Sequence, residues 1–262
     1  MIREHHKKEI DRLIDKFSPD ERFCALIIGG SVAKGTAKDN SDIDVLIVAT
    51  DEEFEQRKEK DNIFYLDREC DYDGGYIDGK VINLQFIKDA ADHGSEPARW
   101  AFTGSFAAYS HIPGLDELIK RIPVYQESEQ GEKLKSFYSQ LALMPWFAGE
   151  GERRSDPYLV LKATTDTVFF AARVVLAHNK MLFPNQKWLM TELPKAPNIP
   201  PTLIALMDDA MSHPSAKATE SIRDCINSHY GDIGISWEEL VTKFIEECEW
   251  NWQEHRPPIQ DW

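Results

Sequence analysis

Two aspartates one residue apart, Asp42 and Asp44, have the type and spacing in this chain that best suit chemistry. They stand at the start of an apolar run that ends at Val48, which predicts a strand. Because side chains alternate along a strand, we expect both carboxylates on one face and the apolar residues between them in a core. Two carboxylates held this close repel each other, and Mg²⁺ accepts such hard oxygen ligands together with phosphate oxygens. The spacing suits a divalent cation site, although an Asp-x-Asp pair by itself is also common on solvated strands and turns.

A glycine–serine turn precedes these acids. Residues 24–28 are a continuous apolar run, typical of a strand covered on both faces, and Gly29-Gly30-Ser31 follows it directly. Glycines permit a tight turn and let another group come close to the backbone. The exposed N–H groups at the start of the helical turn that we expect next are suited to phosphate.

The combined pattern resembles the signature of the polymerase-β-like nucleotidyltransferase superfamily. It consists of an apolar strand, Gly30-Ser31, a short spacer, Asp42-Ile43-Asp44 and a second apolar strand. In size and layout the chain resembles the small bacterial proteins grouped with the antibiotic (aminoglycoside or lincosamide) nucleotidyltransferases. The resemblance implies Mg²⁺-dependent transfer of a nucleoside monophosphate from an NTP, expected to be ATP, to a hydroxyl of a small molecule such as an aminoglycoside.

Nucleotide contacts are expected from both halves of the chain. A segment beginning at Pro184 resembles the Pro-x-x-Lys-Trp-Leu loop found in helical C-terminal domains of small-molecule nucleotidyltransferases, in which the lysine can face the phosphates. The expected nucleotide contacts are Gly29, Gly30, Ser31, Lys34, Ser41 and Lys187.

A third catalytic carboxylate is the point at which the chain departs from the family. Residues 76–87 suggest a hairpin around Asp78-Gly79, and in the superfamily the strand after such a hairpin carries the third acid. The position that matches by apolar alternation is Asn83, and an amide carries no negative charge. Asn83 would be a neutral metal ligand beside Asp42 and Asp44, or Asp78 or Asp73 would reach into the site, or the site would bind nucleotide without turnover.

The net charge of -15 is spread over both halves of the chain and argues against long nucleic acid as the main partner. It is compatible with a cationic acceptor, and simple solubility explains it as well. No apolar run is long enough to span a membrane, and the first residues lack the apolar core of a signal peptide. We expect a cytoplasmic protein with reduced thiols at Cys24, Cys70, Cys225 and Cys248.

The periodicity predicts an α/β (α+β) fold in two parts. Residues 1–123 should form a nucleotidyltransferase domain whose mixed sheet is flanked by helices, and residues 124–262 a helical C-terminal domain that packs as a bundle. Pro145 and the glycines after it should end a helix at Met144, and Asp156 should cap the next one. We expect Trp237, Trp250 and Trp252 near the bundle core and an extended tail over 256–262.

Expected elements of the first part are helices at 2–17, 51–58, 96–102 and 115–122, with strands at 24–28, 42–48, 63–66, 76–87 (as a hairpin) and 105–110. Further helices are expected at 132–144, from 157 through 176, and at 202–212, 216–229 and 236–251.

Competing interpretations concern turnover and the acceptor. A nucleotide-binding or antitoxin-like protein of the same fold is the main alternative, and Asn83 is the residue that favours it. Transfer onto a protein or an RNA end is a third option, of which the acidic charge disfavours the RNA version. Arg99 could meet a phosphate or form a surface ion pair, and Glu150, Glu152 or Asp166 could face the acceptor hydroxyl.

Overall fold

The computed structural model describes residues 2–231, 233–253, 259–260 and 262. The chain divides into two compact units, Met1–Val124 and Tyr125–Trp262. The predicted extended tail over 256–262 falls largely outside the described residues.

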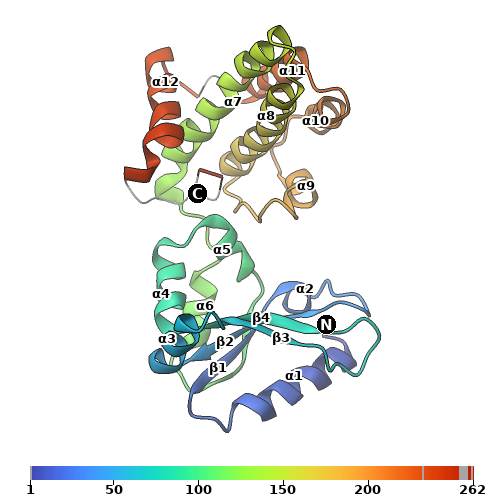
Figure 1. Ribbon diagram of the computed structural model, residues 1–262, viewed down its shortest axis with the longest axis vertical. Coiled ribbons are helices and arrows are strands. Elements are labelled where there is room, and N and C mark those ends of the chain that lie inside the picture. The colour runs from blue at the N-terminus through green and yellow to red at the C-terminus, as the bar shows by residue number, and fades with distance from the viewer. Residues whose placement is uncertain (1, 232, 254–258, 261) are drawn as a thin grey trace. The chain divides into compact units, whose positions relative to one another are not determined.

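A mixed sheet forms the centre of the N-terminal unit, with the strand order β3-β4-β2-β1-β5 among the described residues (Figure 1). The central strand β2 pairs in parallel with β4 and antiparallel with β1. The outer strands β5 and β3 pair antiparallel with β1 and β4. The strand bounds are β1 Phe23–Ile28, β2 Ile43–Ala49, β3 Phe64–Asp67, β4 Ile77–Ile82 and β5 Phe106–Ser110.

Each face of the sheet buries a separate apolar cluster. Ile43, Val45 and Ile47 of β2 point toward α1 and are almost completely buried, as the alternation predicts. The opposite face packs against α4 and α6, whose apolar residues cluster with Ile27, Val48 and Phe102, the residue that follows α5 (Figure 1). The predicted α/β class is therefore confirmed. The helices of this unit are α1 Glu4–Phe17, α2 Gly30–Ala33, α3 Asp51–Glu59, α4 Leu84–His93, α5 Glu96–Ala101 and α6 Leu115–Arg121.

The predicted hairpin over residues 76–87 is wrong. Asp78 and Gly79 lie inside the continuous strand β4, and the residues after Asn83 form α4. A Cβ at position 79 would lie 2.7 Å from the carbonyl carbon of Val45. Glycine is thus present because the backbone of β2 passes very close, and not because the chain turns.

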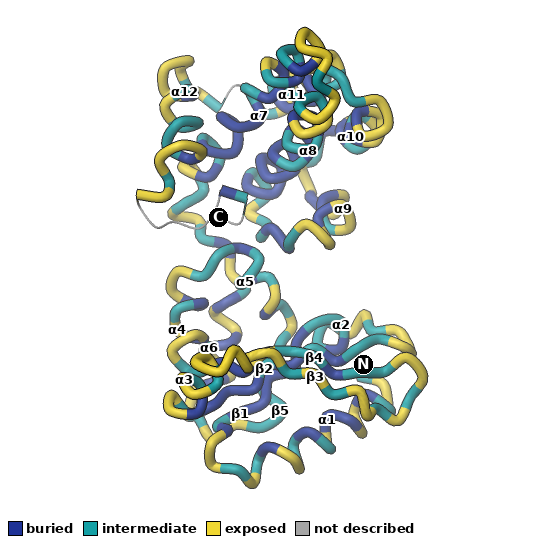
Figure 2. Tube along the Cα trace, in the orientation of Figure 1, coloured by how far each residue is buried: buried dark blue, intermediate teal, exposed yellow. Residues whose placement is uncertain are grey.

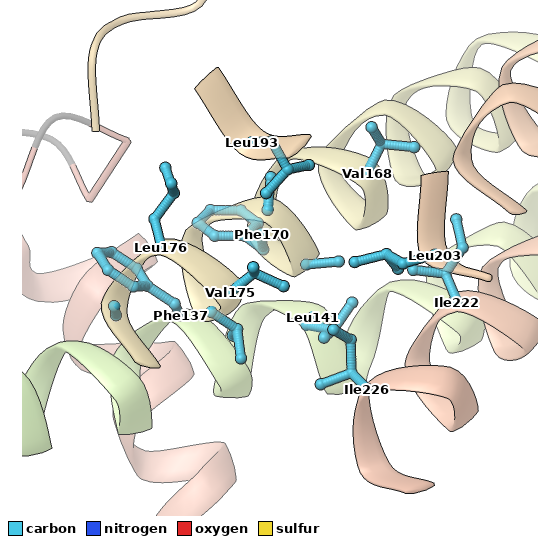
Figure 3. Packing of buried hydrophobic residues seen from close by; sticks show 14 of the residues in the cluster. Phe137, Leu141, Val168, Phe170, Val175, Leu176, Leu193, Leu203, Ile222 and Ile226 are labelled. Carbon is cyan, nitrogen blue, oxygen red and sulfur yellow. The ribbon is translucent and has the colours of Figure 1, made fainter. Parts of the chain in front are cut away.

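The C-terminal unit is helical, and its core lies between α7, α8, α10 and α11 (Figure 3). Asp156 accepts a hydrogen bond from the Leu159 N–H and so caps α8, as predicted. The helices are α7 Gln130–Arg153, α8 Pro157–His178, α9 Leu189–Glu192, α10 Leu203–Ser212, α11 Ala216–Tyr230 and α12 Trp237–Ile245.

Two expectations about this unit are wrong. Pro145 does not end a helix but lies buried inside α7, which continues to Arg153. The tryptophans expected in the bundle, Trp237, Trp250 and Trp252, are all exposed. The cysteines are free thiols, in agreement with the prediction. Over the described ranges, no helix combines the length and apolar character that crossing a bilayer requires.

Candidate active site

The glycine–serine turn lies against the side chain of Asp44. The Gly29 N–H donates to the main-chain carbonyl of Asp44 at 2.9 Å, which extends the pairing of β1 with β2. Gly30 has a φ of +60°, and a Cβ there would lie 2.5 Å from Cγ of Asp44 and closer still to its Oδ2. This glycine therefore permits both the left-handed turn and the close approach of the carboxylate.

Ser31 supplies a buried hydroxyl at the same turn. Its Oγ is shielded from solvent and has no hydrogen-bond partner among the described residues. A buried polar atom without a partner costs free energy unless a ligand or water satisfies it. The turn thus offers a hydroxyl group that could donate a hydrogen bond to a phosphate oxygen.

Asp78 lies directly opposite Asp44 in the parallel pairing of β2 and β4. The residues next to them, Ile43, Val45 and Ile77, are buried on the α1 face, so both carboxylates point to the other face. Neighbouring strands lie about 4.8 Å apart. The sheet thus brings together two acids separated widely in sequence.

Asp42 precedes β2 and is joined to the group through Tyr76. The Tyr76 hydroxyl donates to Oδ2 of Asp42 at 2.8 Å. This hydrogen bond raises the pKa of Tyr76, and the charges of Asp42, Asp78 and Asp44 act in the same direction. The three carboxylates therefore all lie within electrostatic range of one hydroxyl.

The peptide group that carries Asp42 is held by two further side chains. The Ser41 carbonyl accepts hydrogen bonds from the Tyr72 hydroxyl at 2.8 Å and from Nε2 of His6 at 3.2 Å. A carbonyl only accepts, so this contact assigns the His6 proton to Nε2. His6 lies on α1, is fully buried, and has its pKa lowered chiefly by that burial and also by the adjacent His5.

Asn83 is not brought to these acids. It is the N-cap of α4, where its Oδ1 accepts from the Phe86 N–H and its Nδ2 donates to Asp51. It lies five positions beyond Asp78 along β4, a displacement of about 16 Å at the usual rise per residue. The sequence register that placed Asn83 beside Asp42 and Asp44 depended on the hairpin that does not form.

The remaining expected contacts lie in different places. Lys34 ends the short α2, and its Nζ lies 3.1 Å from the centroid of the Trp100 ring. The Ser41 hydroxyl accepts a hydrogen bond from the Lys38 N–H within its own loop. Asp73 is exposed on the loop before β4. Lys187 belongs to the C-terminal unit and lies over the ring of its neighbour Trp188.

Arg99 is a buried hydrogen-bond donor between the helices of the N-terminal unit. It is 1% exposed, and its guanidinium donates to the carbonyls of Ala91, Gly94 and Ile122. It therefore joins α4, α5 and the end of α6 from inside.

The acids of the C-terminal unit considered for the acceptor all have structural partners. Glu150 pairs with Arg153 and Arg154, and Asp166 pairs with Lys162. Glu152 accepts from the Ala216 N–H at the start of α11.

A cation at the site would depend on substrate oxygens. Among the described residues, no cluster of three or more His, Cys, Asp or Glu side chains is arranged to hold a metal ion. Mg²⁺ is commonly held by one or two carboxylates together with substrate phosphates. Asp44 beside the turn and Asp42 on the adjoining loop fit that more limited role.

A cavity of about 270 Å³ lies on the α1 face of the sheet, away from these acids. Its cationic residues are Lys16, Arg22 and Arg57, and each is already within ion-pair distance of an acid. The cavity therefore offers no unpaired charge to a nucleotide.

Tyr76, Tyr72 and His6 were not anticipated as site residues. Tyr76 could have been found once β4 was recognised as one strand, because it lies two residues before Asp78 on the same face. No local sequence signal points to His6 or Tyr72, because their common partner is a main-chain carbonyl far away in sequence.

Comparisons with known proteins bear on the domain and on the fold. Residues 10–90 match the family model described as "Nucleotidyltransferase domain". The chain also resembles the crystal structure of a nucleotidyltransferase-like protein from Exiguobacterium sibiricum 255-15, with a TM-score of 0.51 and 9% sequence identity. That similarity covers 96% of this chain and 81% of the other and concerns the fold alone. No curated protein matches the chain.

Proposed function

Because residues 10–90 form a nucleotidyltransferase domain of the polymerase-β-like superfamily, we propose that the protein transfers a nucleoside monophosphate from an NTP to a hydroxyl group of a small molecule. The observation that carries this proposal is the contact of Gly30 with the Asp44 carboxylate, in a turn that also holds the buried Ser31 hydroxyl. The closeness of the glycine–serine turn to the Asp44 carboxylate supports a site that binds phosphates and a cation together.

The residues divide into three roles. Gly29, Gly30 and Ser31 bind the phosphates of the NTP. Asp42 and Asp44 would hold Mg²⁺, which neutralises the phosphates and polarises the α-phosphorus when it is bound. Lys34, Ser41 and Lys187 remain predicted nucleotide contacts, and ATP remains the expected nucleotide.

Asp78 is the residue best placed to act as the general base. The acceptor oxygen attacks the α-phosphorus while its proton passes to the Asp78 carboxylate, and the bond to pyrophosphate breaks. Asp78 lies on β4 beside Asp44, on the side away from the turn that holds the phosphates. Asn83 is not proposed as a ligand, because it is engaged at the start of α4.

The non-enzymatic alternative rested on an amide at the third acid position. With Asp78 opposite Asp44, that argument no longer applies. The expectation of an aminoglycoside-like acceptor rests on the resemblance and on the net charge of -15, and no described side chain of the site adds to it.

The test compares Asp44→Asn with Asp116→Asn, a control that alters an exposed acid at the start of α6. Calorimetry measures Mg²⁺-dependent NTP binding, and release of pyrophosphate across a panel of hydroxyl acceptors measures turnover. We expect the control to behave like the wild type and Asp44→Asn to lose both signals. Binding without pyrophosphate release in the wild type would favour the nucleotide-binding alternative, and full activity in Asp44→Asn would refute the proposed site.

A further inference from the structure

A row of residues in register crosses the sheet from the acids to its open edge. Asp44 on β2 pairs with Asp78 on β4, and Asp78 pairs with Leu66 on the edge strand β3. Residues in register across a sheet point to the same face. Leu66 is therefore the next side chain beyond Asp78 on the face that carries the carboxylates.

A second row lies one side-chain repeat along the same face. Leu46 on β2 pairs with Lys80 on β4, which pairs with Phe64 on β3. Along β4, Lys80 is separated from Asp78 by about 7 Å, the repeat of two residues in a strand. Lys80, Phe64 and Leu66 thus form a continuous surface beside the acid, which we name the β3–β4 shelf.

The shelf is open because the helices on this face of the sheet cover the part over β1 and leave β3 uncovered. Ile27 on β1 is fully buried in the cluster that includes residues of α4 and α6, whereas Phe64 is 58% exposed and Leu66 is 40% exposed. Exposed and partly exposed residues alternate along β3, while β1 is nearly all buried (Figure 2). The two exposed apolar side chains are neighbours on one short strand and so form a small apolar patch that the chain of a ligand can cover.

Lys80 adds a positive charge to this apolar surface. It is exposed, and its ammonium group forms no hydrogen bond or ion pair with the described residues. The carboxylates that lie closest along the sheet, Asp44 and Asp78, are assigned above to the cation and to the proton of the acceptor. A ligand on the shelf would therefore meet an available cation rather than an available acid.

The direction of the reaction places the acceptor on this side. In phosphoryl transfer the attacking and leaving oxygens lie roughly in line. The leaving pyrophosphate is bound by the turn at the end of β1, so the attacking hydroxyl comes from the β4 side of Asp44. We propose that the acceptor lies on the β3–β4 shelf and is a hydroxyl compound with an apolar chain and an anionic group. This inference rests on the proposed nucleotidyl transfer.

Each part of that acceptor has a partner. The apolar chain covers Phe64 and Leu66, the anionic group pairs with Lys80, and the hydroxyl lies at Asp78. The hydroxyl oxygen forms a bond to the α-phosphorus, its proton goes to Asp78, and pyrophosphate leaves with the electrons of the broken P–O bond. The product is a nucleoside monophosphate ester of the hydroxy acid.

Three probes that share a primary hydroxyl test the assignment. They are a medium-chain ω-hydroxy fatty acid, the amino alcohol of the same chain length, and the polycation kanamycin. Transfer from an α-labelled NTP is followed by chromatography of the labelled ester. We expect kcat/KM for the hydroxy acid to exceed that for the amino alcohol by about tenfold or more, because the charged group of the two probes has opposite sign and Lys80 attracts only the anionic one. Equal or better transfer to the amino alcohol or to kanamycin would overturn the proposal.

Two substitutions and a control locate the effect. Lys80→Glu should lower kcat/KM for the hydroxy acid by about tenfold or more and reverse the preference in favour of the amino alcohol. The matched control Lys88→Glu changes an exposed lysine of α4 and should alter neither. Phe64→Ser should weaken transfer to both chain probes alike while leaving transfer to short hydroxyl compounds unchanged. A Lys80→Glu profile identical to that of Lys88→Glu would overturn the proposal.

Nucleotide binding and oligomeric state are measured alongside transfer. Calorimetry of Mg²⁺-dependent NTP binding is run on every variant and should be unchanged. If the wild-type protein does not bind NTP, the proposed function is wrong. If it binds NTP but does not transfer the nucleoside monophosphate to the hydroxy acid, only the acceptor proposal is wrong. A dimer in solution that Phe64→Ser dissociates would assign the shelf to a second copy of the chain and would also overturn the proposal.

Discussion

Replacing Gly30 by alanine tests the central contact of the site. An added Cβ would lie 2.5 Å from Cγ of Asp44, whereas carbon atoms in contact are normally about 3.5 Å or more apart. The carboxylate must therefore move by about 1 Å, and a misplacement of that size costs about 100-fold in rate. The φ of +60° adds about 1–2 kcal/mol of backbone strain to the folded state.

Gly114→Ala is the matched control, because it has a φ of +74° but open space around the added Cβ. Both variants should lose free energy of unfolding in urea because of the positive φ, and Gly30→Ala should lose more because only its Cβ collides with Asp44. Gly30→Ala alone should lose about 100-fold in Mg²⁺-dependent pyrophosphate release. If the two variants retained equal activity, the contact of the turn with Asp44 would have no part in the chemistry, and the reasoning would be refuted.

Three further predictions concern Tyr76, Arg99 and His6. Tyr76→Phe removes the donor to Asp42, so the Mg²⁺ concentration for half-maximal activity should rise about tenfold in a metal titration, and an unchanged midpoint would contradict the assigned role. Arg99→Met leaves three buried carbonyls without their donor and should cost about 3 kcal/mol in urea unfolding, whereas a loss below about 1 kcal/mol would show that they find other partners. The pKa of His6 is lowered from 6.5 by burial, so the unfolded chain takes up a proton first and the free energy of unfolding should fall as pH drops below 6.5. His6→Gln should reduce that slope, and identical slopes in urea titrations at several pH values would exclude His6 as its source.

Parts of the fold followed directly from the sequence because local pattern and tertiary packing agreed. The alternation of Ile43, Val45 and Ile47 identified the buried face of β2, and Asp156 marked the start of α8. In both places one short-range rule determines the structure, and the rest of the molecule only reinforces it.

The register of residues 76–87 was predicted wrongly because glycine is common both in turns and where two backbones lie very close. An Asp-Gly pair is a strong turn signal, but Gly79 is required by the close approach of the β2 backbone. That approach depends on a neighbouring strand more than thirty positions away, so no local rule could identify it. Correcting this single error brings Asp78, rather than Asn83, into register with Asp44 and turns the following residues from a strand into α4.

The continuation of α7 through Pro145 also depends on contacts with a segment that is distant in sequence. A proline inside a helix loses a hydrogen bond and costs about 3 kcal/mol. Leu141 and Ala148 on either side of it are fully buried, and Gly151 lets the end of α7 approach Val160 of α8 very closely. The packing of α7 on α8 outweighs the local break, and sequence patterns alone cannot weigh the one against the other.

Because Ser41 is hydrogen-bonded to α1, Asp42 should be released by local unfolding more easily than Asp44. Asp44 is fixed by pairing on both sides of a central strand, whereas the peptide before Asp42 is held by side chains from α1 and from a surface loop. Fraying of the first helix would release one acid while the sheet remained intact. Catalytic competence would then disappear at a lower denaturant concentration than the fold itself, and amide hydrogen exchange would show the residues before Asp42 opening ahead of β2.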